Sequence, residues 1–157
     1  MRAIAIGWLI LGTIGCVRTG TIDLGKVPTS GVTQLSTPQA TTLAATMLIQ
    51  ANSDDVQWFR NIEMPIGSTA WELTRAVAKD RLEATYYGAF GSHFVDSLFG
   101  MKNKDPYFWL FFQWNGTSKA WEPVMVGADN LTLLDEMVLA WHYTDSSEPS
   151  AVPAVKP

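Results

Sequence analysis

Few residues in this chain have the types and spacing that catalysis or metal binding requires. The 157 residues include one cysteine, Cys16, and two histidines, His93 and His142, which are far apart in the sequence. A nucleophilic triad needs a base beside its nucleophile, and a zinc site needs closely spaced Cys and His ligands. Asp135 and Glu136 are adjacent, but neighbours on a strand point to opposite faces, which favours a turn over an acid–base pair. The sequence therefore predicts no enzymatic activity, no metal site and no catalytic cofactor.

Aromatic side chains offer a different chemistry, the binding of flat or apolar partners. Of the 18 Phe, Trp and Tyr residues, 17 lie between Trp58 and Tyr143, so the fold and any binding surface should lie in this stretch. With 11 basic against 15 acidic residues, the formal net charge is −4. This balance disfavours a dedicated nucleic-acid binder or a protein that binds an anionic membrane surface, because both need a basic face.

The first residues are typical of an export signal. Arg2 precedes an apolar run over residues 3–15 that is too short to span a bilayer as a helix. The run ends in Thr-Ile-Gly-Cys, which resembles the lipobox of bacterial lipoproteins. We therefore expect a signal peptide at 1–15 and lipid attachment at Cys16, with an ordinary signal peptide and an incidental cysteine as the alternative. Both interpretations place the protein outside the cytoplasm, as a membrane-anchored lipoprotein or a secreted protein.

Composition divides the rest of the chain into three parts. Residues 16–41 are rich in Thr, Ser, Gly and Pro, which predicts a flexible tether after the lipid attachment point. Residues 145–157 hold three prolines among the last nine positions, which predicts a disordered tail. The folded domain should therefore cover residues 42–144.

Within this domain the hydrophobic pattern predicts one helix among several strands. Segments 42–50 and 56–64 should form a hairpin around a polar turn. Thr69 and Glu72 have the spacing of a capping box and should begin a helix. Further strands are expected at 82–87, 93–99, 107–114, 121–126 and 136–143. This order predicts an α+β fold, a β-grasp-like mixed sheet with one helix packed on one face.

One helix cannot cover all the apolar surface that this sheet should carry. The segment 107–114 is apolar on both faces, as expected for a central strand covered on both sides. Asn115 and Gly116 follow it and predict a tight hairpin turn. What covers the face opposite the helix therefore becomes the functional question.

Four segments carry a resemblance to a known family. They read EMPIGSTAWELTRAV at 63–77, AFGSHFVDSLFG at 89–100, YFWLFFQWNG at 107–116 and LDEMVLAWHY at 134–143. In this order and spacing they resemble the C-terminal β-domain of the transcobalamin and intrinsic-factor family. The resemblance implies one half of a clamp around cobalamin, whose other half in that family is a helical barrel.

The resemblance also implies which residues reach the ligand. A loop and strand of the family match Ala89, Phe90, Gly91, Ser92, His93 and Phe94, with Ser92 as an insertion. A hairpin of the family, longer in this sequence, gives the candidates Trp109, Phe111, Gln113, Asn115, Gly116 and Trp121. An aromatic ring at Phe90 could lie on a corrin face, and Gln113 and Asn115 could bond to amide side chains around the ring.

Some of these residues keep a second interpretation. His93 could be an axial ligand to cobalt, because imidazole suits such metals. A histidine at the start of a strand and bonded to the backbone is the alternative that we favour. Trp109 and Phe111 could equally belong to the core, and Trp121 could form a cross-strand aromatic pair with Trp114.

The resulting hypothesis is an extracytoplasmic, non-catalytic module that binds cobalamin, another corrinoid or a similar flat amphipathic ligand. A second protein or a second copy of the chain would complete the clamp. The alternative is a protein–protein or cell-envelope assembly module that uses the same aromatic face for docking. In either case contact with a membrane should occur only through the N-terminal lipid.

Overall fold

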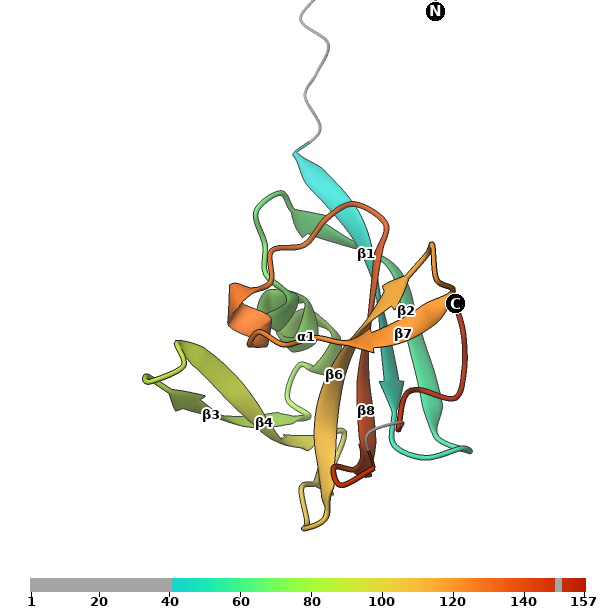
Figure 1. Cartoon of the computed structure of the whole chain (residues 1–157). Helices are drawn as coiled ribbons and strands as arrows, with labels where there is room; N and C mark the ends of the chain where they lie inside the picture. The colour runs from blue at the N-terminus through green and yellow to red at the C-terminus, as the bar shows by residue number, and fades with distance from the viewer. Residues whose placement is uncertain (1–40, 149–150) are drawn as a thin grey trace, which may run out of the picture. The chain divides into compact units, whose positions relative to one another are not determined.

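A computed structural model describes residues 41–148 and 151–157 (Figure 1). The predicted signal peptide, Cys16 and the predicted tether up to residue 40 lie outside these ranges and stay predictions. In the described ranges, no helix has the length and apolar character needed to cross a bilayer.

The largest element is a five-stranded sheet in which the first and last strands are neighbours. Its order is β2 (Val56–Pro65), β1 (Thr42–Gln50), β8 (Met137–Asp145), β6 (Tyr107–Asn115) and β7 (Ala120–Pro123). β1 and β8 run parallel, and all the other neighbours in this sheet are antiparallel. β8 therefore lies between the β1–β2 and β6–β7 hairpins, parallel to β1, which agrees with the predicted β-grasp-like mixed sheet.

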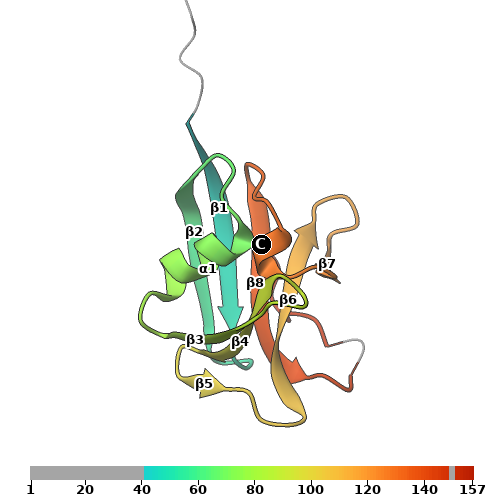
Figure 2. The same cartoon turned by 90° about the vertical axis from the view of Figure 1, so that its left-hand side faces the viewer.

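Helix α1 (Ala70–Ala78) covers part of one face of this sheet (Figure 2). Its predicted capping box is confirmed: the Thr69 hydroxyl accepts from the Glu72 amide, and the Glu72 carboxylate accepts from the Thr69 amide at 2.7 Å. Leu73 and Val77 are buried in the core beneath the helix. The α+β class, with one helix on one face of a mixed sheet, is therefore confirmed.

A second, three-stranded sheet was not expected from the sequence. It has the order β3 (Leu82–Tyr87), β4 (Ser92–Leu98) and β5 (Met101–Lys102), with antiparallel neighbours. Val95 and Leu98 of β4 are buried in the same core as the helix. The small sheet therefore covers apolar surface that one helix leaves open.

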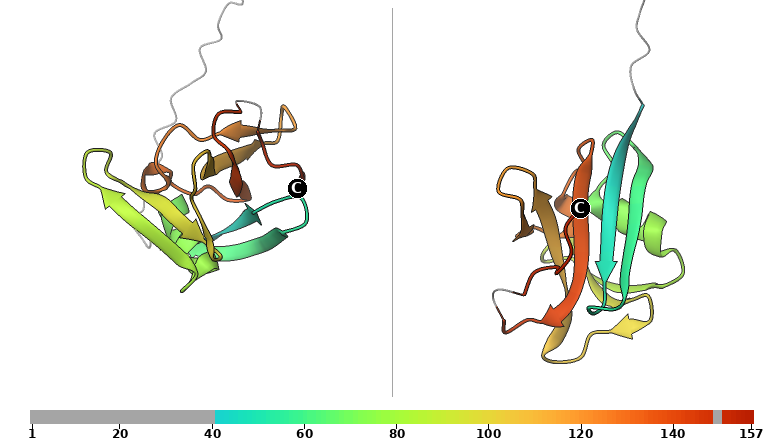
Figure 3. Two further views of the ribbon diagram at one scale, coloured as in Figure 1. Left: turned by 90° about the horizontal axis from the view of Figure 1, so that it is seen from below. Right: turned by 90° about the vertical axis from the view of Figure 1, so that its right-hand side faces the viewer.

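The opposite face of the five-stranded sheet carries a second apolar cluster, and the C-terminal segment packs on it. Leu48, Phe112, Trp121 and Ala140 are buried there, and Val155 packs against them. The Trp121 indole N–H donates to the Val155 carbonyl oxygen at 2.7 Å. Figure 3 (right) shows this segment in front of the sheet, with α1 behind it.

The predicted disordered tail therefore differs from the structure in its described parts. β8 continues to Asp145, and Pro153 is buried. Prolines prevent the segment 151–157 from pairing as a strand. They do not prevent it from burying apolar side chains and forming hydrogen bonds with side chains of the sheet.

β8 also carries a half-buried histidine, His142. Its Nδ1 lies 3.3 Å from the carbonyl oxygen of Gln50, and its ring packs beside Phe112. Burial lowers the pKa of His142 below 6.5, and the hydrogen bond with Gln50 opposes this only in part. The fold thus favours the neutral imidazole.

Lowering the pH below 6.5 should consequently destabilise the folded domain. Unfolded His142 takes up a proton near pH 6.5, whereas folded His142 does so only at lower pH. The free energy of unfolding should then fall as the pH drops through this window, by at most about 1.4 kcal/mol per pH unit from this group. Denaturant unfolding from about pH 7.5 to about pH 5 measures the slope. His142→Gln should reduce it, and an unchanged slope would contradict this assignment.

Candidate functional site

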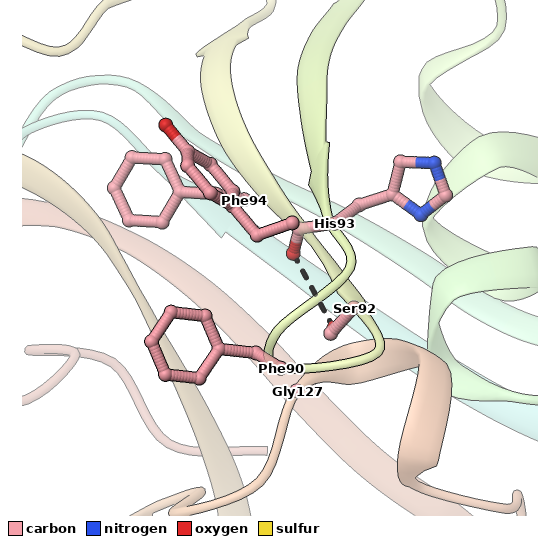
Figure 4. Close-up of a pocket in the computed structure, with 6 residues that line it drawn as sticks. Phe90, Ser92, His93, Phe94 and Gly127 are labelled. Carbon is pink, nitrogen blue, oxygen red and sulfur yellow. Dashed lines mark hydrogen bonds between the residues drawn. The ribbon is translucent and has the colours of Figure 1, made fainter.

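An open pocket of 410 Å³ lies where β3 turns into β4 (Figure 4). Its walls are mostly aromatic and come from two distant parts of the sequence. The lining residues are Tyr87, Phe90, Ser92, His93, Phe94 and Gly127. Four of the predicted ligand contacts therefore lie together, on the segment 90–94.

The turn between β3 and β4 holds Phe90 out toward solvent. The Phe90 amide donates to the Tyr87 carbonyl at 3.0 Å, and Gly91 adopts a φ of +60° that glycine tolerates without strain. Phe90 is 77% exposed as a result. Tyr87 and Phe94 are also exposed, and their rings meet edge to face with centroids 6.3 Å apart. Ala89 lies in the same exposed turn but does not line the pocket.

Asp129 ties this turn to the short 3₁₀ helix η1 (Ala128–Asn130). Its carboxylate accepts three hydrogen bonds, from the Ser92 hydroxyl at 2.9 Å and from the His93 amide and Nδ1 at 2.8 Å each. Burial raises the pKa of Asp129, but the hydrogen bonds from His93 and Ser92 outweigh it and lower the pKa below 3.8. Asp129 therefore holds the first residues of β4 as an anion.

The imidazole of His93 points away from the aromatic pocket. Figure 4 shows its ring on the opposite side of the strand from Phe90 and Phe94. Successive residues on a strand alternate between faces, so His93 contributes backbone to the pocket while its ring stacks on Trp71, with centroids 4.2 Å apart. The ring cannot be an axial ligand to a metal held in this pocket. The alternative that we favoured, a histidine bonded to the backbone, is also wrong in its partner, because the ring bonds to the Asp129 carboxylate.

Three predicted ligand contacts on the second segment are buried instead. Trp109 and Phe111 lie in the core beneath α1, and Trp121 lies in the cluster on the other face. The Trp109 indole N–H donates to the Met101 carbonyl at 2.9 Å, and the Phe111 ring stacks on Trp141. These rings fill space between the sheet and its covering layers, so the prediction that they contact a ligand does not agree with their burial.

The end of the β6–β7 hairpin lies far from the pocket. Asn115 accepts hydrogen bonds from the Thr117 and Ser118 amides, so its side chain stabilises the turn. Gly116 is exposed and Gln113 is half-buried on β6. Figures 1 and 3 (left) place this turn and the β3–β4 turn on opposite sides of the domain. The structure does not bring the two predicted ligand segments together.

Sequence reasoning missed several residues that build the site. Asp129 and Gly127 lie in a loop with no regular pattern, and nothing in the sequence indicates that this loop meets β4. Gly127 lies so close to Ser92 that a Cβ at this position would overlap the Ser92 side chain. Tyr87 could have been found, because it precedes a glycine-bounded turn and is followed by Phe90.

Exposed apolar residues continue beyond the pocket. Met125 and Val126 are exposed and immediately precede Gly127. The exposed apolar surface here is therefore built from two chain segments, 87–94 and 125–127. In residues 41–148 and 151–157 there is no cluster of three or more His, Cys, Asp or Glu placed to hold a metal ion.

Two solved structures share this fold at low sequence identity. Haptocorrin in complex with Cbi matches with a TM-score of 0.54 and 13% identity, over 66% of this chain and 25% of the haptocorrin chain. A proposed metal binding protein from Ruminococcus gnavus ATCC 29149 matches with a TM-score of 0.51 and 12% identity, over 66% of this chain and 98% of its own. No family model and no curated protein matches the chain. These likenesses support the predicted resemblance at the level of the fold.

Replacing Gly127 by alanine should destabilise the domain. The new Cβ would overlap the Ser92 side chain, which is buried, so β4 or the loop must shift. We expect a loss of about 1–3 kcal/mol in the free energy of unfolding, as for other overpacked sites. Gly116→Ala is the matched control, because nothing lies within 4 Å of a Cβ there. Equal denaturation midpoints for the two variants would contradict the close packing.

Removing the Asp129 carboxylate should loosen the start of β4. Asp129→Ala leaves the His93 amide and the Ser92 hydroxyl without their acceptor, so the free energy of unfolding at neutral pH should fall by about 1–3 kcal/mol. Because the pKa of Asp129 is lowered in the fold, its contribution is present above pH 3.8 and is lost as the pH falls through the folded pKa. The variant should lack that acid-dependent loss, which unfolding curves at low pH would detect.

Proposed function

We propose that the domain binds a corrinoid, or a similarly flat amphipathic small molecule, in the pocket at the β3–β4 turn, and that it does so without catalysis. The observation that carries this proposal is the gathering of three exposed rings, Tyr87, Phe90 and Phe94, around a pocket of 410 Å³. The fold shared with haptocorrin, whose structure holds the corrinoid Cbi, supports the class of ligand.

Aromatic contact would supply most of the affinity. A flat ligand on the rings of Phe90 and Phe94 removes apolar surface from water, at roughly 25 cal/mol per Å² before the costs of association. Carbonyl and amide groups of the turn could bond to polar groups at the ligand's edge. The pocket is open on one side, so a second protein or a second copy of the chain would cover the other face of the ligand.

Two titratable groups beside the pocket, His93 and Asp129, are engaged away from it. The His93 ring faces Trp71 on the far side of β4, and the Asp129 carboxylate is occupied by three hydrogen bonds. Neither group is directed into the pocket, where general acid–base catalysis would need it.

A second candidate function is the docking of another protein on the same surface. Met125 and Val126 favour it, because they extend the exposed apolar surface beyond the pocket. A small ligand would use mainly Phe90 and Phe94, whereas a protein partner would also cover Met125. Binding that depends on Met125 but not on Phe90 would favour this alternative.

Titration with cobinamide or cobalamin, followed by visible absorbance and calorimetry, tests the first proposal. We expect saturable binding that Tyr87→Ala or Phe90→Ala weakens about tenfold, the effect of losing one aromatic contact. Tyr107→Ala is the matched control, because Tyr107 is 48% exposed and stacks on one ring, much as Tyr87 is 47% exposed and contacts Phe94. Tyr107 lies outside the pocket. Absence of binding at high micromolar concentration by the folded chain, or equal losses in all variants, would overturn the proposal.

A further inference from the structure

The C-terminal segment lies on its sheet as a bound peptide does. It belongs to neither sheet, and side chains of the five-stranded sheet hold its backbone. The Gln50 side-chain oxygen accepts from the Ala154 amide at 3.0 Å, and the Trp121 indole donates to the Val155 carbonyl at 2.7 Å. Pro153 is buried and Val155 is half-buried.

The surface beneath this segment is rich in tryptophan. We name it the tryptophan face, and it consists of Leu48, Trp58, Phe112, Trp114, Trp121 and Ala140. Trp58 and Trp121 come from β2 and β7, the two edges of the sheet, yet their ring centroids are 6.4 Å apart. The sheet therefore curves around this face, and Trp114 packs edge to face on Trp121.

Such a surface has the chemistry that recognises extended, proline-containing peptides. Those peptides expose carbonyl groups that have no internal partners, and they dock on aromatic grooves whose side chains supply the missing hydrogen bonds. The segment Ala-Val-Pro-Ala-Val-Lys-Pro at 151–157 shares the proline content and the lack of strand pairing, and its backbone bends at Ala154 and Val155. Pro153 and Val155 bury apolar surface, while Trp121 and Gln50 bond to the backbone of the segment.

We propose that the tryptophan face is a binding site for a proline- and valine-containing peptide, that residues 151–157 occupy it in cis, and that a peptide of the same chemistry can replace them in trans. Exchange is feasible because the segment is held by two side-chain hydrogen bonds and no strand pairing. This site lies on the sheet face opposite α1, so it does not depend on the pocket at the β3–β4 turn.

The experiment first displaces residues 151–157 from the tryptophan face in the full chain and then adds a peptide that can bind in their place. Val155→Asp places a carboxylate against the tryptophan face and should release the segment. Val152→Asp is the matched control, because Val152 is 40% exposed and lies outside the apolar cluster. The probe is a synthetic peptide with the sequence of residues 151–157. The readout is the NMR signal of the Trp121 indole N–H, assigned with Trp121→Phe.

We expect the Trp121 signal to shift in Val155→Asp and not in Val152→Asp. The synthetic peptide should restore it saturably, whereas a peptide carrying the same Val-to-Asp change should not. Unaltered protein should bind the peptide at least about tenfold more weakly than Val155→Asp, because the segment in cis competes. The proposal would be overturned if folded Val155→Asp protein did not bind the peptide at millimolar concentration. Identical indole NMR spectra for the two variants would also overturn it.

A second measurement decides the matter if Val155→Asp does not fold. Spin-labelled peptide is added in excess to the unaltered protein, and broadening of the indole signals is recorded. Saturable broadening that is stronger for Trp58, Trp114 and Trp121 than for Trp71, Trp109 and Trp141 supports exchange in trans. No broadening, or equal broadening of all the indoles, overturns it.

Discussion

β1 and β8 lie side by side at the centre of the five-stranded sheet, and each strand has consecutive residues buried on both faces of the sheet. Met47, Leu48 and Ile49 are consecutive, point alternately to the two sides, and are all at most 2% exposed. A sheet whose central strands are apolar on both faces needs a covering layer on each face. α1 and the small sheet cover one side, and the C-terminal segment covers part of the other. The positions of the pocket and of the C-terminal segment depend on how these covering layers are attached to the sheet.

The pocket owes its position to the way the small sheet is anchored. Val95 and Leu98 are buried in the core, which leaves the opposite face of β4 and its turn free to carry Phe90 and Phe94. The start of the strand is fixed from both sides, by the Asp129 carboxylate and by the stacking of His93 on Trp71. His93 is thus a structural link between helix and strand, and the aromatic residues beside it, Phe90 and Phe94, stay exposed.

The sequence pattern predicted local features well and long-range partners poorly. The capping box of Thr69 and Glu72 and the hairpin of β1 and β2 follow from neighbours in the chain, and both are confirmed. The contact of Asp129 with His93 joins residues 36 positions apart, and no periodicity signals it. The sequence around Trp109 and Trp121 does not indicate whether these rings belong to the core or contact a ligand. The segment 151–157 has a composition typical of disorder, and only the tryptophans beneath it make its packing favourable.

The parallel pairing of β1 with β8 also determines how the domain would carry a mechanical load. β1 starts at Thr42 and β8 ends at Asp145, and the two strands run in the same direction. Tension applied between these two ends acts along the strands, so the hydrogen bonds from Ala45 to Gln50 are sheared together rather than opened one after another. If the load is applied to the C-terminal segment instead, that segment would peel away first, because it pairs with no strand. The central pair would then resist as one unit.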